Sequence, residues 1–441
     1  MPGPHGGRPA ARPRAALRLR GCVRVRRTQG RAVSAGLVLY EDRHWRDLRP
    51  LTDVVPVPAL AFGADTLGGR LARAAGLPLL ATVARPAALA ARGAAGAPPA
   101  PPAPGEPVLV LNAAALPGPW LAAAREARVP ALLVGDGRVA GAHLPWSMLA
   151  PGLARGEDFE TFLLGLALPA FPCDAAFVQF PWHLIERNAD AIAADLAARP
   201  AAVAGEVHPA AVVLEPGRVI VEAGARVEPL AVLDARSGPI LVGAGALVRS
   251  HTVVTGPCVV GPGTQLLGGF VSRSTIGPEC RIAGEVEECV WQGYANKRHH
   301  GFVGHSAIGE WVNLGALTTT SDLKNNYGNV RVWVDGRELD SRSPKVGSVI
   351  GAHVKTGIGT LLPTGASIGT GANLFGGGRF APKRVPAFGW WDGETMAEHR
   401  LERFLETARV AHARRGRELG PDEAAALEAL FAATAGERRA G

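Results

Sequence analysis

The sequence predicts a left-handed parallel β-helix in the second half of the chain, with an α/β domain before it and helices after it. Two observations carry this prediction. Aliphatic residues recur at a spacing of six after residue 206, and a glycine often follows the aliphatic residue directly, as in VGPGTQ and IGAHVK. Each hexapeptide is then one short strand plus a corner, and three of them close a triangular coil around an apolar axis. A β-sandwich would instead show a period of two.

The six-residue register breaks twice along the predicted prism. The predicted axial positions are Val221, Val227, Leu233, Val242, Val248, Val254, Val260, Leu266, Ile276, Ile282, Ile308, Leu314, Ile350, Thr356, Leu362, Ile368, Leu374 and Phe380. One break lies between Ile282 and Ile308, the other between Thr318 and Ile350. We expect both to be loops that leave the prism, and loops on a rigid scaffold are where functional sites concentrate.

The part of the chain before the β-helix has the pattern of an α/β domain. VSAGLVLYED predicts a strand, TLGGRLARAAG a helix, and PVLVLNAAALP and PALLVGDGRVAG two further strands. An amphipathic helix over 181–199 is expected to join the domains, and residues 397–433 to form helices outside the prism. The predicted division is a disordered basic arm at 1–35, the α/β domain at 36–180, a linking helix at 181–205, the β-helix at 206–388 and C-terminal helices at 389–441.

Charge and composition argue against nucleic-acid binding, a membrane span and secretion. The formal net charge is +8, but the first 31 residues hold many arginines and no acidic residue, so the remainder is close to neutral. We therefore expect no nucleic-acid partner. No apolar run is long enough to span a membrane, and no secretory signal is evident. The five cysteines form no CxxC pair and indicate free thiols in a reducing cytoplasm.

Residue types that are rare elsewhere in the chain gather around the two breaks. All five lysines lie between Lys297 and Lys383, and two of the three tyrosines are Tyr294 and Tyr327. Imidazole titrates near neutrality, so His299 or His300 is a candidate general base. The candidates to hold phosphates or to bind sugar hydroxyls are Lys297, Arg298, Lys324, Asn296, Asn313, Asn326 and Tyr327. The alternative is that these polar groups satisfy loop backbone and subunit contacts.

The segments YANKRHHGFVGHSAIGEWVNLGA and SDLKNNYGNVRV resemble a bacterial family of sugar nucleotidyltransferases. That family is related to the bifunctional N-acetylglucosamine-1-phosphate uridyltransferase/glucosamine-1-phosphate acetyltransferase. The resemblance reaches the N-terminal LVLYEDRHWRDLRPLTDVVPVPALAFGADTLGGR, which implies a nucleotidyltransferase-like front domain. It implies transfer of an acetyl group from acetyl-CoA to an amino or hydroxyl group of a sugar phosphate or nucleotide sugar. The implied assembly is a homotrimer with sites between neighbouring prisms.

The resemblance also implies roles for individual residues. His299 falls on the family's catalytic histidine when HHGFVG is laid on its HLTYLG pattern, and Asn313 of VNLGA matches the asparagine of VNIGA. The backbone N–H groups near Gly315 and Ala316 are expected to stabilise the oxyanion of the tetrahedral intermediate. The residues expected along the CoA arm are Lys355, Gly357 and Arg379.

Three alternatives remain open from the sequence. Nucleotidyl transfer by the front domain would use Mg²⁺, with Asp42, Asp47 and Asp53 as weak ligand candidates, although the Gly-rich opening LAAGxGTR is absent. A carbonic-anhydrase-like zinc site would use His300 and His305, which are five apart, with no obvious third ligand. The last alternative is a trimeric scaffold without catalysis.

Overall fold

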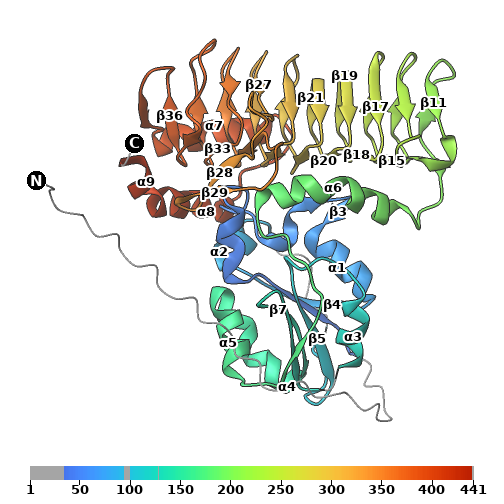
Figure 1. The fold of residues 1–441 in the computed structure, drawn as a ribbon, viewed down its shortest axis with the longest axis vertical. Helices are drawn as coiled ribbons and strands as arrows, with labels where there is room; N and C mark the ends of the chain where they lie inside the picture. Colours follow the sequence, from blue (N-terminus) through green and yellow to red (C-terminus); the bar gives the residue numbers. More distant parts are fainter. Residues whose placement is uncertain (1–33, 94–99, 128, 440–441) are drawn as a thin grey trace, which may run out of the picture.

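The computed structural model describes residues 34–93, 100–127 and 129–439, so the basic arm predicted at 1–35 lies almost wholly outside the described part. The predicted fold class is confirmed. Figure 1 shows an α/β domain beside a long parallel β-helix, with helices at its C-terminal end. Among the described residues, no helix has the length and apolarity needed to cross a membrane.

The N-terminal domain is built on a mixed six-stranded sheet. Its strands, in spatial order, are β4 Leu79–Val83, β1 Leu37–Tyr40, β5 Pro107–Asn112, β7 Arg138–Pro145, β6 Ala131–Gly135 and β8 Ala170–Pro172. β1 is parallel to β4 and β5, whereas β7 is antiparallel to both of its neighbours. Its helices are η1 Arg43–Leu48, α1 Leu67–Ala75, α2 Pro86–Ala90, α3 Trp120–Glu126, α4 Trp146–Leu149 and α5 Phe159–Gly165. The sheet brings the ends of β1 and β5 together at one edge.

The three faces of the prism are parallel ladders. The first holds β9 Ala202–Val203, β12 Val219–Val221, β15 Ile240–Val242, β18 Cys258–Val260, β20 Thr275–Ile276, β22 Val290–Trp291, β25 Ala307–Ile308, β30 Ser348–Ile350, β33 Ala366–Ile368 and β35 Arg384–Val385. The second holds β10 Glu206–Val207, β13 Arg226–Val227, β16 Leu247–Val248, β19 Gln265–Ser272, β21 Arg281–Glu287, β23 Asn296–Lys297, β26 Asn313–Leu314, β31 Lys355–Thr356, β34 Asn373–Leu374 and β36 Gly389–Trp391. The third holds β11 Val212–Leu214, β14 Val232–Asp234, β17 Thr252–Thr255, β24 Phe302–Gly304, β27 Thr319–Thr320, β32 Leu361–Leu362 and the second halves of β19 and β21.

The hexapeptide register describes the interior of the prism with one exception. The predicted aliphatic positions from Val221 to Leu374 belong to one continuous buried cluster along the axis. Thr356 is also buried. Phe380 was predicted to be axial, but 66% of it is exposed, and the neighbouring Ala381 is buried instead. The buried positions Leu374 and Ala381 are seven residues apart and not six, so the register of the last coil is shifted by one residue.

The first break in the register does not leave the prism, contrary to the prediction. Residues 283–307 continue the coil through the end of β21, β22, β23 and β24. Val286, Trp291, Lys297 and Val303 are all buried there, at ladder positions that aliphatic residues hold in the other coils. A lysine and a tryptophan at such positions hid the repeat from the sequence pattern.

The second break does leave the prism, as predicted. It carries the hairpin β28 Arg331–Val334 and β29 Arg337–Asp340. Val330, Val332 and Val334 pack in the same apolar cluster as the N-terminal domain. Arg337 pairs with Asp47 of η1, and the hairpin therefore ties the prism to the front domain.

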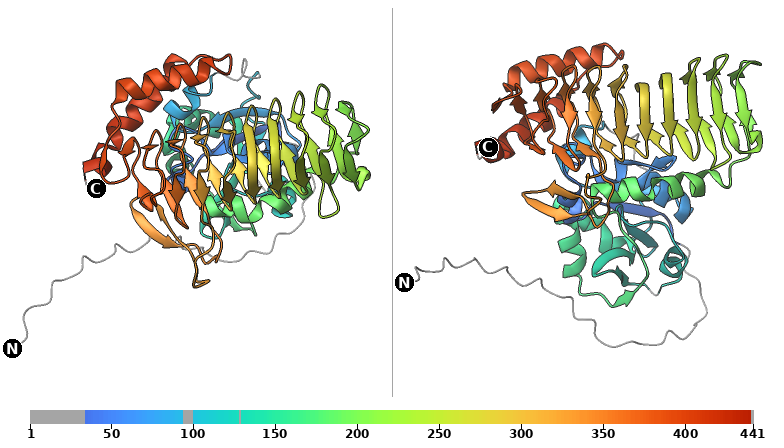
Figure 2. Two further views of the ribbon diagram at one scale, coloured as in Figure 1. Left: turned by 90° about the horizontal axis from the view of Figure 1, so that it is seen from above. Right: turned by 45° about the horizontal axis from the view of Figure 1, so that its top comes forward.

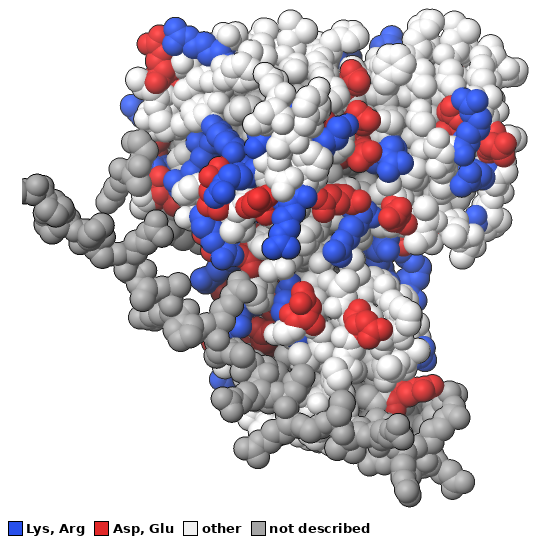
Figure 3. All heavy atoms as spheres, viewed as in Figure 1, with Lys and Arg blue, Asp and Glu red and all other residues white. Residues whose placement is uncertain are grey.

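A long helix lies along the first face of the prism. α6 Pro181–Leu196 occupies the segment where an amphipathic helix was expected, and Figure 1 shows it between the prism and the front domain. Its Ile192 and Leu196 pack on Ile220, Leu241 and Val259, the outward side chains of three successive coils. Figure 3 shows basic and acidic side chains interspersed where the two domains meet.

The chain ends in helices beside the last coils. They are α7 Leu401–Ala413, α8 Pro421–Ala433 and α9 Ala435–Arg439, and both views of Figure 2 show them outside the prism. The helical segment was expected from residue 389, but β36 and β37 Met396–Glu398 still belong to the second face. Trp391 is buried at the end of the axis, and capping the apolar column requires this extra strand pair.

Candidate functional site

Two exposed histidines stand at one corner of the prism. His299 and His300 follow β23 and precede β24, and both side chains are exposed. The carbonyl of His300 accepts a hydrogen bond of 2.8 Å from the amide of Leu317 in the next coil. Gly301 has a φ of 134°, and a Cβ there would lie 2.2 Å from the carbonyl oxygen of Thr318. The corner backbone is thus stacked on its neighbour while the imidazoles stay accessible.

Lys297 holds this corner from inside the prism. Its side chain is 1% exposed, and Nζ donates to the carbonyl oxygens of Ala283 at 2.6 Å and His299 at 3.0 Å. Burial lowers the pKa of Lys297 to about 8. We expected this ammonium group to bind a substrate phosphate. It is instead committed to the backbone, because its Cα lies at an axial position and the carbonyls are its nearest acceptors.

The two predicted asparagines on the second face bind each other. Asn296 and Asn313 are neighbours in the parallel ladder, and Asn296 Nδ2 donates to Asn313 Oδ1 at 2.7 Å. Both side chains are half-buried, whereas Arg298 beside them is exposed. Asn296 lies three residues before His299, and Asn313 lies one coil away. These three residues are therefore near the corner along the chain or in the next coil, and their part in substrate binding stays a prediction.

The other predicted sugar ligands lie on the loop that precedes the hairpin. Tyr327 is 75% exposed, and its amide donates to the carbonyl of Lys324 at 2.9 Å. Asn326 Oδ1 accepts from the amide of Gly328 at 3.1 Å. Within the described residues, no hydrogen bond or ion pair links this loop to the histidine corner. The fold brings together the corner residues but does not join the loop to them.

His305 is not free to act as a ligand in the alternative zinc site. Nδ1 lies 2.7 Å from Asp322 Oδ2 and Nε2 lies 3.3 Å from Glu288 Oε2, so both ring nitrogens are occupied. Burial on its own lowers the pKa of His305, but the hydrogen bonds to Asp322 and Glu288 outweigh burial and raise the pKa to about 9. In the described part of the chain, His300 and His305 belong to no group of three side chains placed to hold a metal.

The predicted oxyanion donors are only partly available. The amide of Gly315 donates to the carbonyl of Thr356 at 3.1 Å and to Thr356 Oγ1 at 3.0 Å, because the corners of adjacent coils stack here. The amide of Ala316 makes no backbone hydrogen bond among the described residues. Of the two predicted groups, only the amide of Ala316 remains a candidate donor.

An open groove follows the same corner toward the end of the prism. It contains Gly357 and Arg379, both expected along a CoA arm, and it adds residues that the sequence reasoning missed. The lining residues are Gly357, Ile358, Phe375, Gly376, Gly377, Arg379, Asp392, Gly393 and Glu394. The missed signal was the pair of large apolar residues at corner positions, where glycine or a polar residue is usual.

Large apolar side chains form an exposed ridge along this corner. Leu317, Ile358 and Phe375 come from successive coils and are 58%, 72% and 65% exposed. We refer to these three residues as the apolar ridge. Hydrogen bonds from Leu317 N to His300 O and from Gly359 N to Ala316 O place the ridge directly below the histidine corner. Contiguous apolar surface of this kind marks binding sites and interfaces.

Lys355 lies outside the groove, contrary to its predicted role. Its Nζ donates to the carbonyl oxygens of Trp311 at 2.8 Å and His353 at 3.3 Å, on the opposite side of the second face. Burial lowers the pKa of Lys355 to about 8. Like Lys297, this lysine stabilises a corner backbone and is not free for a ligand.

The three aspartates proposed for Mg²⁺ are separately engaged. Asp42 Oδ2 accepts from Arg138 Nη2 at 2.6 Å and from Asn112 Nδ2 at 2.8 Å. Asp47 pairs with Arg337 and accepts from His44 Nδ1 at 3.0 Å. Among the described residues these aspartates form no group of three that could hold a metal, so their carboxylates do not fit a Mg²⁺ site in this structure.

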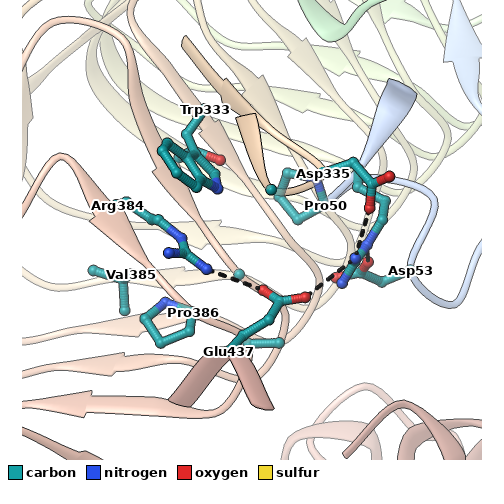
Figure 4. Close-up of a pocket in the computed structure, with 13 residues that line it drawn as sticks. Pro50, Asp53, Trp333, Asp335, Arg384, Val385, Pro386 and Glu437 are labelled. Carbon is teal, nitrogen blue, oxygen red and sulfur yellow. Dashed lines mark hydrogen bonds and ion pairs between the residues drawn. The ribbon is translucent and has the colours of Figure 1, made fainter. Parts of the chain in front are cut away.

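Asp53 lies in a small pocket where three parts of the chain meet. Figure 4 shows Asp53, Asp335 of the hairpin and Glu437 of α9 around this pocket, which is also lined by Arg49. The Arg49 guanidinium lies 2.6 Å from Asp53 Oδ1, 3.1 Å from Asp335 Oδ1 and 3.2 Å from Glu437 Oε1. Arg384 of β35 also reaches Glu437, at 3.6 Å. This pocket is filled by ion pairs that join the domains.

Comparison with known proteins shows what the front domain is similar to. Residues 37–201 match the sequence model of the sugar nucleotidyl transferase family. The predicted resemblance is confirmed. A bifunctional sugar-1-phosphate nucleotidylyltransferase/acetyltransferase of Sulfurisphaera tokodaii is 38% identical over 93 residues, 21% of this chain and 23% of that protein. The bifunctional protein GlmU of Micrococcus luteus is 30% identical over 177 residues, 39% of this chain and 30% of that protein.

These similarities are partial. The chain spans less than a third of the length of either relative. A solved UDP-N-acetylglucosamine acyltransferase from Arabidopsis aligns with 48% of this chain and 76% of its own, at 14% identity and a TM-score of 0.20. That score is too low to support a functional conclusion.

The front domain has a closed edge where its parallel strands end. Glu41, directly after β1, accepts from Arg85 Nε at 2.8 Å and from the amide of Val57 at 2.6 Å. The Glu41 and Asp42 side chains are each 1% exposed. The chain after β1 forms the short helix η1 and no glycine-rich loop. Charges that could meet a nucleotide are therefore neutralised within the domain.

Proposed function

We propose that this chain transfers an acyl group, acetyl in the first instance, from acyl-CoA to a sugar phosphate or nucleotide sugar. The acceptor is an amino or hydroxyl group of that sugar. The observation that carries the proposal is the corner with His299 and His300, where accessible imidazoles stand on a backbone fixed by buried Lys297. The name of the Sulfurisphaera relative includes an acetyltransferase activity, which supports the same reaction class.

The reaction needs one base at the acceptor. His299 accepts a proton from the amino or hydroxyl group of the acceptor as that group attacks the thioester carbonyl. A base is needed because an ammonium group has no lone pair with which to attack. The carbon–sulfur bond then breaks, and CoA leaves as a thiolate that regains a proton from the imidazolium. In this scheme His300 is the neighbouring alternative base. The amide of Ala316 is the proposed donor to the tetrahedral oxyanion.

The groove beyond the corner is the proposed path of the CoA arm. Its walls are apolar at Ile358 and Phe375, which suits a pantetheine chain. Arg379 is paired with Glu394 at 2.9 Å, and we propose that the CoA phosphates displace this carboxylate from the guanidinium. The groove is open on one side. We propose that a second copy of the chain covers the apolar ridge, and that three copies complete three such sites. Four free cysteines fit a reducing compartment, and we place the reaction in the cytoplasm.

A substrate panel tests the proposal. Purified protein is incubated with acetyl-CoA and amino-sugar phosphates, sugar phosphates or nucleotide sugars, and release of free thiol is followed. We expect release with at least one acceptor and none without an acceptor. A folded trimer that releases no thiol with any acceptor contradicts the proposal.

The front domain supports a second candidate function, nucleotidyl transfer to a sugar 1-phosphate. The match of residues 37–201 to the sugar nucleotidyl transferase family favours it. The ion pairs of Glu41 with Arg85 and of Asp42 with Arg138 oppose it, because they occupy the carboxylates nearest the strand ends. Incubation with nucleoside triphosphates, Mg²⁺ and sugar 1-phosphates tests it through pyrophosphate release. We expect no release above the level of a blank without protein.

A further inference from the structure

A second cluster of histidines lies where the C-terminal helices meet the prism. His353 stands at the corner between β30 and β31, His412 lies near the end of α7, and Glu423 is in the first turn of α8. Three segments that are distant in the sequence thus supply one side chain each. This cluster is on the opposite side of the second face from the groove and has no part in the function proposed above.

The three side chains converge on a common point. His412 Nε2 lies 3.5 Å from Glu423 Oε1, and His353 Nε2 lies 4.0 Å from the same oxygen. One candidate ligand atom from each residue lies within 4.8 Å of the other two. The imidazole planes of His353 and His412 are only 10° apart, with ring centroids separated by 5.7 Å.

Burial leaves these imidazoles without hydrogen-bond partners. His353 is 3% exposed and His412 is 1% exposed. Nδ1 of His353 and Nε2 of His412 have no hydrogen-bond partner among the described residues, and the backbone of Glu418 lies beside the His412 ring. A buried polar group without a partner costs about 1–3 kcal/mol, so native proteins seldom keep several together without a ligand. Trp311 stacks on His412 at 3.7 Å and fixes the ring orientation.

The surrounding charges leave one carboxylate for a cation. Lys355 is bonded to the carbonyls of Trp311 and His353, Arg417 to the hydroxyl of Tyr294, and Arg92 to Glu310. In the described part of the chain, the Glu423 carboxyl lies within 4.0 Å of the two histidines and is paired with no lysine or arginine.

We propose that His353, His412 and Glu423 form a binding site for a divalent transition-metal ion, for which Zn²⁺ is the best match. Two imidazoles and one carboxylate are ligands that zinc prefers, and a fourth position would be open to water. The ligand atoms are slightly farther apart than in a loaded site, so binding would draw α7 and α8 toward the prism. The ion would act as a clamp on the C-terminal helices.

Zinc binding by the full-length chain tests the proposal. Untagged protein is stripped with a chelator and titrated with Zn²⁺ in a calorimeter, and its zinc content is also measured after purification without chelator. We expect one equivalent of Zn²⁺ per chain and a higher melting temperature with Zn²⁺. Wild-type protein that binds no stoichiometric zinc at micromolar concentration overturns the proposal and leaves only a buried histidine–glutamate cluster.

Variants separate these ligands from their neighbours. Glu423→Gln keeps the shape of a partly exposed side chain, and we expect it to fold and to weaken Zn²⁺ binding by at least about tenfold. His412→Gln should do the same. Glu310→Gln is the matched control, because it removes a nearby carboxylate that is not in the proposed set, and we expect it to bind like the wild type. Unchanged affinity in Glu423→Gln, or a loss in Glu310→Gln alone, overturns the assignment.

Discussion

The segments 283–307 and 321–347 lie close together in the chain but use the prism in opposite ways. Residues 283–307 stay in the coil and present His299 and His300 at a corner, held from inside by Lys297. Residues 321–347 leave the coil as a hairpin, and its valines and ion pairs bind the front domain. Residues 283–307 thus form a rigid corner that can position catalytic side chains, whereas residues 321–347 hold the two domains together. We refer to residues 321–347 as the bracket.

The corner is rigid because its backbone is stacked between neighbouring coils, whereas the bracket is held in place by side-chain contacts. The corner backbone is bonded to the coils on both sides, so its position hardly depends on exposed groups. The loop from Lys324 to Tyr327 is exposed from residue 325 onward and is bonded mainly to itself. The following predictions contrast the two segments, beginning with the largest expected effect.

The apolar ridge below the corner should be required for assembly and activity. Ile358→Glu puts a charge on a side chain that is 72% exposed in one copy, and burying that charge against a second copy is costly. We expect light scattering to show a trimer for the wild type and a monomer for this variant. Thiol release should fall by at least about 100-fold, because the groove loses one wall.

Val410→Glu is the matched control for the ridge. Val410 is also apolar and 61% exposed, but it lies on α7, outside the ridge. We expect a trimer with unchanged activity. A fully active Ile358→Glu monomer would show that the corner works without a neighbouring copy.

Lys297→Met should loosen the corner, whereas Lys324→Met should leave the bracket intact. The first change removes the partner of two carbonyl oxygens, and we expect the free energy of unfolding to fall by about 1–3 kcal/mol. Amide exchange near His299 should rise and kcat should fall. Lys324 is half-buried and makes no side-chain hydrogen bond or ion pair among the described residues, so we expect a change within about 0.5 kcal/mol. Equal effects in chemical denaturation would remove the distinction between the segments.

His305 should make stability depend on pH at the join between the two segments. It bridges Glu288 and Asp322, and its pKa is raised to about 9, above the value of an unfolded chain. A group whose pKa rises on folding stabilises the fold fully below its unfolded pKa, near 6.5, and loses that contribution as pH rises through 9. We expect the wild type to lose about 1–3 kcal/mol between pH 6.5 and 9. His305→Gln should show a flat profile over this range, and a parallel decline in both proteins would refute the assignment.

Tyr327→Phe tests whether the loop of the bracket also binds the substrate. Its hydroxyl lies on a side chain that is 75% exposed, so the loss of one hydrogen bond should raise KM for the sugar by roughly two- to tenfold. We expect kcat and melting temperature to stay unchanged. An unaltered KM would confine substrate recognition to the corner and its ladder neighbours.

The sequence predicted the repeat, because axial aliphatic residues and corner glycines follow directly from coil geometry. It placed His299 and His300 in a loop outside the prism, whereas they stand at a corner of a continuing coil. It could not predict that Lys297 points inward, since a lysine at an axial position contradicts the usual burial of apolar groups. It also missed the pairing of His353 with His412, which depends on how α7 packs on the prism. The engagement of Asp42 with Arg138 across 96 residues likewise follows only from the sheet order.

Comparing His299→Ala with His300→Ala in acetyl transfer tests the central claim most directly. Both side chains are exposed at one corner, so neither change should alter folding, and each is the control for the other. We expect thiol release by His299→Ala to fall by about 10²–10⁴, the usual cost of removing a general base, with His300→Ala close to the wild type. The reverse pattern would move the base to His300. Full activity in both variants would contradict acyl transfer at this corner.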